Sequence, residues 1–235
     1  MTSNRLNTLA LTLLMAPASL ALAQDKLDLK NQKIRASYAI GADIGTNMKR
    51  QDLDLDPKAV AAGITDAFAD KLSLTKEEMK QVLTAFQAEM MSKMESRQKA
   101  AGEENLKKGQ TFLAENGKKD GVKSTATGLQ YKVTKSGTGK TPKSTDTVKV
   151  HYHGTLIDGT VFDSSVERGE PVSFPVNGVI PGWTEALQLM KEGDKWQLYI
   201  PAKLAYGEQS PGGKIGPNSV LIFDVELLAV EAPGK

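Results

Sequence analysis

Apolar residues recur at every third or fourth position in the first half of the chain, and at every second position in much of the second half. The longer spacing is typical of one face of an α-helix, whereas strict alternation is typical of a β-strand with one buried face. The period changes after Gly117. The pattern therefore predicts a helical region at about 31–119, followed by an α+β region at 121–235.

The helical region contains signals for three helices. The first has an apolar face formed by Ile34, Tyr38, Ala42, Gly45 and Met48. Asp56 followed by Pro57 is typical of a helix start, because the carboxylate accepts backbone N–H bonds and proline needs no donor there. The apolar stripe of this second helix is formed by Val60, Ile64, Ala67 and Phe68. Thr75 and Glu78 have the spacing of a capping box, which predicts the start of a third helix.

The third helix is predicted to be long and to change character along its length. Its first turns carry an apolar stripe formed by Met79, Val82, Leu83, Phe86, Met90 and Met94. From 95 to 105 the sequence is polar on every helical face, which is typical of a helix that crosses solvent between domains. No proline interrupts it, so an unbroken helix at 75–118 would be roughly 65 Å long. We expect Gly102 and Gly109 to weaken it locally.

The N-terminal helices are too few to form a stable core alone, because about forty-five residues rarely bury enough apolar surface to offset chain entropy. A second copy of the chain is the simplest partner for the Met and Phe stripe, and methionine suits an adaptable interface. The alternative is that the stripe packs on the C-terminal half of the same chain. The polar stretch after Met94 separates the two halves, so we favour a homodimer. Residues 24–74 would form the dimerisation region, and 75–120 a connecting helix whose first part joins the dimer core.

The C-terminal region alternates in short runs that turn signals separate. The runs at 129–133, 148–152, 196–200 and 221–227 predict strands, and the stretch at 183–190 has helical spacing. Residues 121–128 are rich in Ser, Thr and Gly, which predicts a linker or turn. The expected fold class is a small α+β domain at 121–235, in which an antiparallel sheet curls over one short helix.

The charge distribution indicates which partners to expect, and the N-terminal sequence indicates the cellular compartment. Lys and Arg total 30 against 28 Asp and Glu, interleaved along the chain, which does not predict a nucleic-acid partner. One Arg, an apolar run and small residues before Gln24 follow one another in the order of a secretory signal peptide, so we expect residues 1–23 to be removed. A buried N-terminal helix is the alternative. We therefore expect an exported protein that is periplasmic, associated with the outer membrane, or secreted.

Candidate chemistry is sparse. The chain contains no cysteine, which excludes disulfides and thiol nucleophiles within it. Its two histidines, His151 and His153, point to one face of a predicted strand, where a solvated surface is a better interpretation than a metal pair. No nucleophile elbow, phosphate loop or dinucleotide fingerprint occurs. We therefore predict no metal and no cofactor.

Several aromatic residues lie near predicted turns, and any one of them is more often core than site. Their sequence context is more specific. Five motifs occur in order: Val-His-Tyr-His-Gly at 150–154, Asp-Gly-Thr-Val-Phe-Asp-Ser-Ser at 158–165, Val-Ile-Pro-Gly-Trp at 179–183, Ala-Tyr-Gly at 205–207, and Leu-Ile-Phe-Asp-Val-Glu-Leu at 221–227. Across 129–230 they resemble the FKBP-type peptidyl-prolyl isomerases. The helical region, with Ser-Tyr-Ala-Ile-Gly-Ala-Asp-Ile-Gly at 37–45, is similar to the macrophage infectivity potentiator proteins, whose N-terminal helices form a dimer.

The resemblance implies a proline-binding pocket. Trp183 would form its floor, and its sides would be formed by Tyr152, Phe162, Phe174, Val179, Ile180, Tyr206 and Phe223. Asp163 and Tyr206 would act on the substrate, Arg168 would pair with Asp163, and Ile215 would cover the pocket from a loop at 208–218. Val172 occupies a wall position that is often aromatic in this family, which predicts a wider pocket on that side.

The implied activity is cis–trans isomerisation of prolyl peptides in unfolded exported proteins, with chaperone activity as a dimer. Rapamycin-like macrolides are implied inhibitors. A holdase in which isomerisation is incidental, and a surface factor associated with virulence, remain alternatives.

Overall fold

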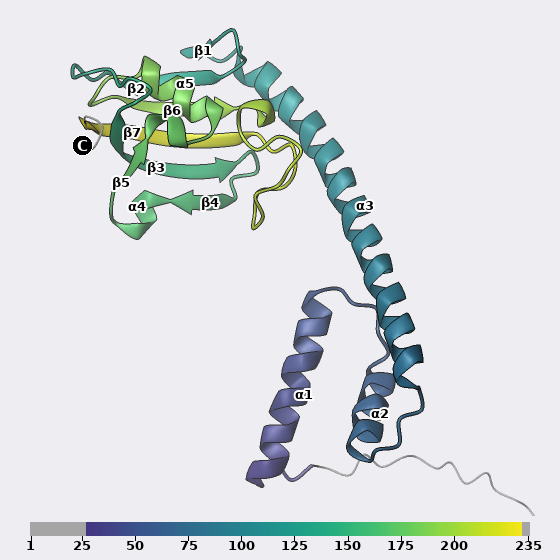
Figure 1. Cartoon of the computed structure of the whole chain (residues 1–235). Helices are drawn as coiled ribbons and strands as arrows, with labels where there is room; N and C mark the ends of the chain where they lie inside the picture. Colours follow the sequence, from purple (N-terminus) through teal and green to yellow (C-terminus); the bar gives the residue numbers. More distant parts are fainter. Residues whose placement is uncertain (1–26, 232–235) are drawn as a thin grey trace, which may run out of the picture. The chain divides into compact units, whose positions relative to one another are not determined.

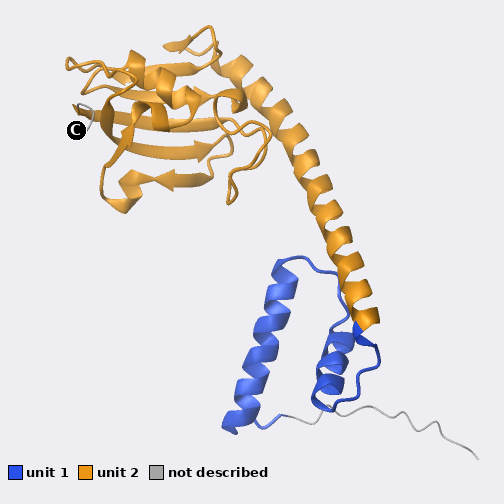
Figure 2. Cartoon of the chain, in the orientation of Figure 1, with its two compact units in different colours: residues 1–76 blue, residues 77–235 orange. Residues whose placement is uncertain are grey.

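A computed structural model describes residues 27–231 of the chain. The predicted signal peptide at 1–23 lies outside the described residues. The chain divides into two compact units at residues 1–76 and 77–235 (Figure 2). Between residues 27 and 231, no helix is both long enough and apolar enough to cross a membrane.

The N-terminal unit contains two helices, α1 (Gln32–Arg50) and α2 (Pro57–Phe68) (Figure 1). The Asn31 side chain accepts backbone N–H bonds at the start of α1, and Asp56 does the same for α2, as the Asp-Pro pair predicted. Neither helix contains a buried residue. Local sequence signals are enough to form both helices, but within one chain the apolar faces of α1 and α2 stay outside any hydrophobic core.

Helix α3 (Lys76–Asn116) is one continuous helix of 41 residues, as the absence of proline predicted. Nearly all of it belongs to the C-terminal unit, and its last four turns pack on the sheet domain rather than standing free in solvent. Gly102, Gly109 and Asn116 are buried there. A Cβ atom at Gly109 would lie 2.7 Å from Val220 Cγ2. Gly102 and Gly109 therefore let the helix approach the domain closely, a role that was not predicted for them.

The end of α3 is tied to the sheet by polar contacts. Asn116 Nδ2 donates a hydrogen bond to Gln130 Oε1 at 3.0 Å, and Gln130 Nε2 donates to the carbonyl of Leu113 at 2.9 Å. Phe112 lies against Tyr199, with ring centroids 6.0 Å apart. The end of α3 and the sheet domain are thus joined by side-chain contacts beyond the polar stretch predicted at 95–105.

All strand pairs in the C-terminal unit are antiparallel, and the order is β1-β2-β6-β7-β3-β4, with β5 also paired to β3. The strands are β1 (Val122–Ser124), β2 (Gln130–Lys135), β3 (Thr147–Leu156), β4 (Val161–Ser164), β5 (Val172–Pro175), β6 (Lys195–Ile200) and β7 (Leu221–Glu231). β1 falls within the stretch predicted as a linker or turn, so that prediction is wrong for 122–124. Its three residues are too few and too polar to show a strand period.

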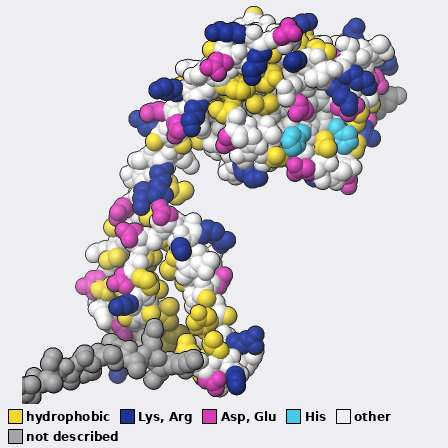
Figure 3. Space-filling view, turned by 180° about the vertical axis from the view of Figure 1, so that it is seen from behind, with side chains coloured by type: hydrophobic (Ala, Val, Ile, Leu, Met, Phe, Trp, Pro, Cys, Tyr) yellow, Lys and Arg dark blue, Asp and Glu magenta, His cyan; other side chains and the backbone are white. Residues whose placement is uncertain are grey.

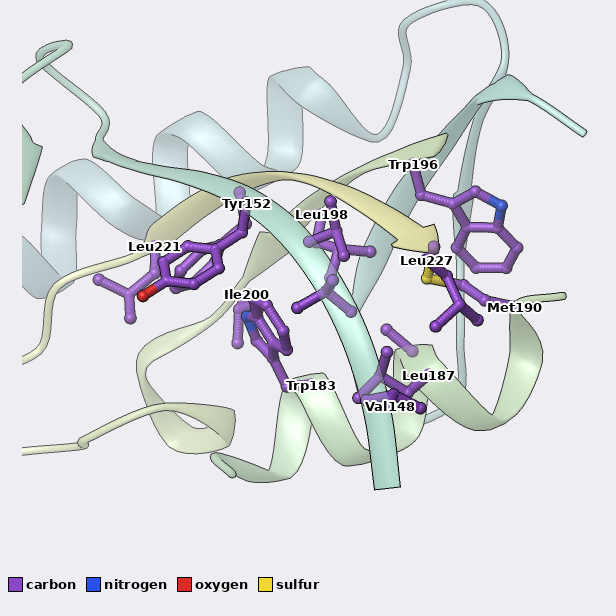
Figure 4. Close-up of a cluster of buried hydrophobic side chains, with 14 of the residues drawn as sticks. Val148, Tyr152, Trp183, Leu187, Met190, Trp196, Leu198, Ile200, Leu221 and Leu227 are labelled. Atoms are coloured by element: carbon purple, nitrogen blue, oxygen red, sulfur yellow. The ribbon is translucent and has the colours of Figure 1, made fainter. Parts of the chain in front are cut away.

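One short helix, α5 (Pro181–Leu189), packs on the concave face of the sheet, as predicted (Figure 1). Figure 4 shows Trp183, Leu187 and the following Met190 pointing toward side chains of the central strands. The largest fully buried apolar side chains are Leu129, Val148, Val150, Val176, Leu187, Met190, Leu198, Ile200, Leu221 and Leu227. Each buried Leu or Ile contributes about 1.5–3 kcal/mol by leaving water, so this core holds the walls of the site in place.

Candidate functional site

A pocket of about 710 Å³ opens between α5, the strands β3, β4 and β7, and the loop that connects β6 to β7. Its lining consists of Tyr152, Phe162, Asp163, Phe174, Gly178, Val179, Ile180, Trp183, Tyr206, Pro211, Gly212, Ile215 and Phe223. Aromatic and aliphatic groups dominate this set, and Asp163 is its only charged member. Such a lining suits an apolar ring flanked by a few polar groups.

Trp183 forms the centre of the aromatic cluster. Its ring meets those of Tyr152 and Phe223 edge to face, with centroids 5.5 and 5.2 Å apart. Phe174 contacts both Trp183 and Tyr152. Such edge-to-face pairs hold each ring in one orientation. Pro181 begins α5 and places Trp183 in its first turn, so the backbone itself directs this ring to the base of the pocket.

Gly154 makes room for the opposite wall. β3 pairs Gly154 with Asp163 of β4 and with Phe223 of β7. A Cβ atom at this position would lie 2.7 Å from the Phe162 ring and 3.0 Å from the Phe223 ring, which is too close for any other residue. The glycine therefore lets Phe162 lie across β3 and meet Phe223 edge to face at 5.3 Å.

The polar side of the pocket is a three-residue network. The Tyr152 hydroxyl donates to Asp163 Oδ2, and Arg168 Nη1 donates to Asp163 Oδ1. Arg168 Nη2 also donates to the Tyr152 hydroxyl at 2.9 Å. Asp163 is the last residue but one of β4, next to Ser164, which is the N-cap of α4 (Ser165–Arg168). A single turn of helix therefore returns the guanidinium to the carboxylate.

This network holds the carboxylate in its charged form. Partial burial by itself would raise the pKa of Asp163, but the hydrogen bonds from Tyr152 and Arg168 and the Arg168 charge outweigh it, so its pKa lies below the ordinary value. Burial, followed by the hydrogen bond to the carboxylate, raises the pKa of Tyr152. At neutral pH the pocket therefore presents a fixed anion beside a neutral phenol.

Tyr206 differs from the other aromatic residues because it is largely exposed, with 42% of its surface accessible. It lines the pocket from the loop side. Within the described part of the chain, no hydrogen bond to its hydroxyl occurs. That hydroxyl can therefore donate to a ligand without breaking an existing bond.

The structure brings the predicted pocket residues other than Val172 together around one cavity. Arg168 lies behind the wall, where it reaches Asp163 and Tyr152. Val172, expected as a wall residue, does not line the pocket; it pairs with Val150 and packs on the core. Gly178, Pro211 and Gly212 line the pocket without having been predicted. The Pro-Gly-Gly sequence at 211–213 predicts a turn, but it does not predict which part of the protein the turn lies against.

Ser165 is a further residue that the sequence did not single out. It is fully buried, and its hydroxyl accepts a hydrogen bond from the Tyr152 backbone N–H at 2.8 Å, which fixes the strand that carries Tyr152. His151 Nδ1 lies 3.1 Å from the same hydroxyl, and His153 Nδ1 lies 3.0 Å from Ser164 Oγ. Both histidines are half-buried and bonded to serine, not simply solvated. Among residues 27–231, no group of three His, Cys, Asp or Glu side chains is placed to hold a metal ion.

A curved antiparallel sheet over one helix, with an aromatic cup and one hydrogen-bonded carboxylate, is the geometry of a domain that can bind a small apolar group beside a fixed charge. Comparison with known families is more specific. A model described as FKBP-type peptidyl-prolyl cis-trans isomerase matches residues 138–228, and one described as the domain amino terminal to that isomerase matches residues 33–133. The chain belongs to the FKBP-type peptidyl-prolyl cis-trans isomerases, and the predicted family, fold class and activity are confirmed.

Relatives match both regions of the chain. The outer membrane protein MIP of Legionella longbeachae is 47% identical over 218 residues, which cover 92% of this chain and 94% of that protein. The isomerase FkpA of Escherichia coli K12 is 44% identical over 220 residues, covering 91% of this chain and 81% of the relative. The crystal structure of FkpA from Escherichia coli matches with a TM-score of 0.70 at 44% identity, covering 87% of this chain and 99% of that one.

Proposed function

We propose that the pocket based on Trp183 receives the proline ring of exported or unfolded polypeptides, and that Asp163 and Tyr206 act on the adjoining amide. The observation that carries this assignment is the single hydrogen-bonded carboxylate at the side of an otherwise apolar cup. Peptidyl-prolyl substrates follow from the family, and the residue roles are those that the resemblance to the family implies, combined with the geometry of the pocket.

The physical basis is the polarity of the amide. Rotation about the peptide bond is opposed by about 18–20 kcal/mol of resonance, and the planar amide is more charge-separated than the twisted one. Water stabilises the planar form through hydrogen bonds, and an aromatic cup does so less. Transfer into the cup therefore favours the twisted state relative to the planar state, and a shape that fits the twisted imide adds to this effect.

The two polar groups then have separate tasks. Isomerisation moves no proton, so the Asp163 carboxylate serves as a fixed charge that orients the prolyl amide, with Tyr152 and Arg168 holding it in place. The exposed Tyr206 hydroxyl donates a hydrogen bond to a substrate carbonyl. The mechanism needs no covalent intermediate, metal or cofactor.

A prolyl isomerase assay of the chain starting at Gln24, with and without rapamycin, tests this function. We expect turnover of a prolyl tetrapeptide and its inhibition by the macrolide, because both would occupy the same cup. Turnover that rapamycin leaves unchanged would remove the macrolide from the proposal, and absence of turnover would remove the site assignment.

The N-terminal unit supports a second role, as a dimeric holdase. Its helices have no buried residue, and Tyr38, Ile40 and Phe68 expose 56%, 63% and 89% of their surfaces. Figure 3 shows hydrophobic side chains gathered on this unit. A cavity of about 340 Å³ between α1 and α2 is lined by apolar residues and one lysine, so it suits a packed apolar side chain better than chemistry. A second copy of the chain would cover this surface, and the dimer would offer two pockets to one client.

Removal of residues 24–94 tests the holdase role while keeping the part of α3 that packs on the sheet domain. We expect the shortened chain to retain peptide turnover and to lose suppression of aggregation. Equal suppression by the shortened and full chains would contradict the proposal.

Two observations support a proposed compartment: the N-terminal sequence and the description of one relative. Residues 1–23 have the order of a signal peptide, and the relative from Legionella longbeachae is described as an outer membrane protein. We propose export to the periplasm, with or without attachment to the outer membrane. Cell fractionation with N-terminal sequencing of the mature chain tests it: cleavage before Gln24 supports export, and an intact N-terminus in the cytoplasm contradicts it. Surface labelling of intact cells tests the virulence-factor alternative.

A further inference from the structure

The loop between β6 and β7, residues 207–219, forms one side of the prolyl pocket. Pro211, Gly212 and Ile215 line the cavity, and Ile215 is 91% buried, because only 9% of its surface is accessible. Inside the loop, Gly212 and Ile215 form an isolated bridge, and Ser210 Oγ donates to the Ile215 carbonyl. These local bonds shape the tip of the loop but do not fix its distance from Trp183.

The tip is held on one side by β4. Lys214 Nζ donates to the Val161 carbonyl at 2.7 Å, next to Phe162 in the pocket wall. At the base, the Asn218 backbone N–H donates to the Gly207 carbonyl at 2.7 Å and closes the loop. A lysine on a flexible stem constrains position weakly, so the rigid support for this loop must come from elsewhere.

That support is α3. Asn105 Nδ2 donates to the Pro217 carbonyl at 2.9 Å, and this contact joins residues 112 positions apart in the sequence. Asn218 Nδ2 reaches the Gly102 carbonyl at 3.4 Å, and a Cβ atom at Gly102 would lie 3.2 Å from Pro217 Cβ. Figure 1 shows the loop beside this part of the helix.

Two cavities of about 90 and 420 Å³ lie between α3 and the domain near this contact. The smaller one is lined by Asn105 itself, so the Asn105 side chain is not packed tightly on every side. The helix region involved also lies within the segment whose polarity predicted a solvated helix, and one of its polar side chains has a specific partner.

We propose that α3 acts as the outer support of the pocket loop, and that Asn105 is a positioning residue for substrate binding. Asn105 does not touch the pocket. It acts through Pro217, two residues after Ile215, and thereby sets how closely Ile215 approaches a peptide over Trp183. This inference rests on the proposed prolyl-binding role of the pocket.

Asn105→Asp tests the proposal in the full mature chain, because it keeps the shape of the side chain but replaces the donor with an oxygen that repels the Pro217 carbonyl. Gln98→Glu, which adds the same charge on the exposed surface of α3, is the matched control. The assay is a protease-free isomerase measurement of kcat and KM. In the proposed site Ile215 would contact planar and twisted peptides alike. We therefore expect KM to rise roughly threefold to tenfold, the equivalent of one lost hydrogen bond, with kcat nearly unchanged.

Two further readouts separate positioning from general stability. Hydrogen exchange should increase in residues 207–219 and stay unchanged in β7, and the unfolding midpoint should match that of Gln98→Glu. A methyl group at residue 216 would lie 2.9 Å from Asn105 Nδ2, so Gly216→Ala should raise KM alone and have little further effect when combined with Asn105→Ala.

An unchanged KM in Asn105→Asp, or strictly additive effects of Asn105→Ala and Gly216→Ala, would overturn this inference while wild-type turnover left the proposed function intact. Absence of turnover in the wild-type chain would instead contradict the proposed function.

Discussion

The two units of this chain form helices and strands from equally clear sequence patterns, yet they differ in what they bury. Neither α1 nor α2 contains a buried residue, whereas the sheet domain encloses Leu198, Ile200 and Leu221 almost completely. Secondary structure is local, but a core needs apolar faces that can meet. The N-terminal unit has such faces without a partner inside one chain, and the sheet domain supplies its own. This difference supports the proposed homodimer, in which the first unit would be the assembly surface, whereas the sheet domain completes its core within one chain.

The largest expected effect is on the core of the sheet domain. Leu198→Ala removes a side chain that is 1% exposed, so the free energy of unfolding should fall by about 2–5 kcal/mol. Leu72→Ala, at a position that is 47% exposed, is the matched change in the N-terminal unit. Denaturant unfolding followed by tryptophan fluorescence measures the sheet domain, where Trp183 and Trp196 lie, and circular dichroism of the helical signal measures the N-terminal unit. Similar decreases in the free energy of unfolding for the two variants would contradict the difference in burial between the two units.

The next effect concerns assembly. Ile44→Glu places a charge in the apolar cavity between α1 and α2, and burying an unpaired charge at an interface is unfavourable. We expect the wild-type chain to sediment as a dimer and the variant as a monomer at micromolar concentration. Lys30→Glu, at an exposed position outside that cavity, should stay dimeric. A monomeric wild type would contradict the proposed homodimer.

Within the sheet domain, the pocket charge can be removed without changing shape. Asp163→Asn keeps an acceptor for Tyr152 but loses the charge that Arg168 stabilises, so kcat/KM for a prolyl tetrapeptide should fall about tenfold. Asp158→Asn, in the turn before β4, serves as control and should retain full turnover. Circular dichroism checks that both variants fold. Full activity of Asp163→Asn would remove Asp163 from the site.

Tyr206→Phe deletes one exposed hydroxyl and should lower kcat/KM about threefold, the size of a single neutral hydrogen bond. Tyr38→Phe makes the same change in the N-terminal unit, on a helix with no buried residue, and should leave kcat/KM unaltered. Equal turnover of wild type and Tyr206→Phe would leave the substrate carbonyl without its proposed donor.

The smallest expected effect is the change of kcat/KM with pH near neutrality. The pKa of Asp163 is lowered in the folded state, so the stability that its bonds contribute is present above the ordinary aspartate value of about 4 and is lost as pH falls through the lower folded value. We expect kcat/KM to be flat from about pH 8 to pH 5 and to fall only below about pH 4. A pH profile of the wild type, with Asp163→Asn as the control that lacks this transition, measures it. An inflection near pH 6 would contradict the assignment of this transition to Asp163.

Much of the site was predictable because its residues occur in five contiguous motifs. The order of those motifs indicated the aromatic cup, Asp163 and Tyr206, and the pairing of Arg168 with Asp163 needs only one turn of helix between them. Ser165 was not singled out, because a serine within a motif does not reveal that its hydroxyl accepts the Tyr152 N–H. β1 was missed because three mostly polar residues carry no period.

The sequence by itself determined the helical N-terminal region, the continuous third helix, the α+β class of the second half and the family. These follow from periodicity, capping and motif order, which are local in the chain. Only the tertiary structure decided that Gly102, Asn105 and Gly109 meet the loop and strand after Tyr206, and that Val172 faces the core. Contacts between residues more than a hundred positions apart depend on how the sheet folds. The sequence around a glycine or asparagine on a polar helix does not indicate which distant residue it will contact.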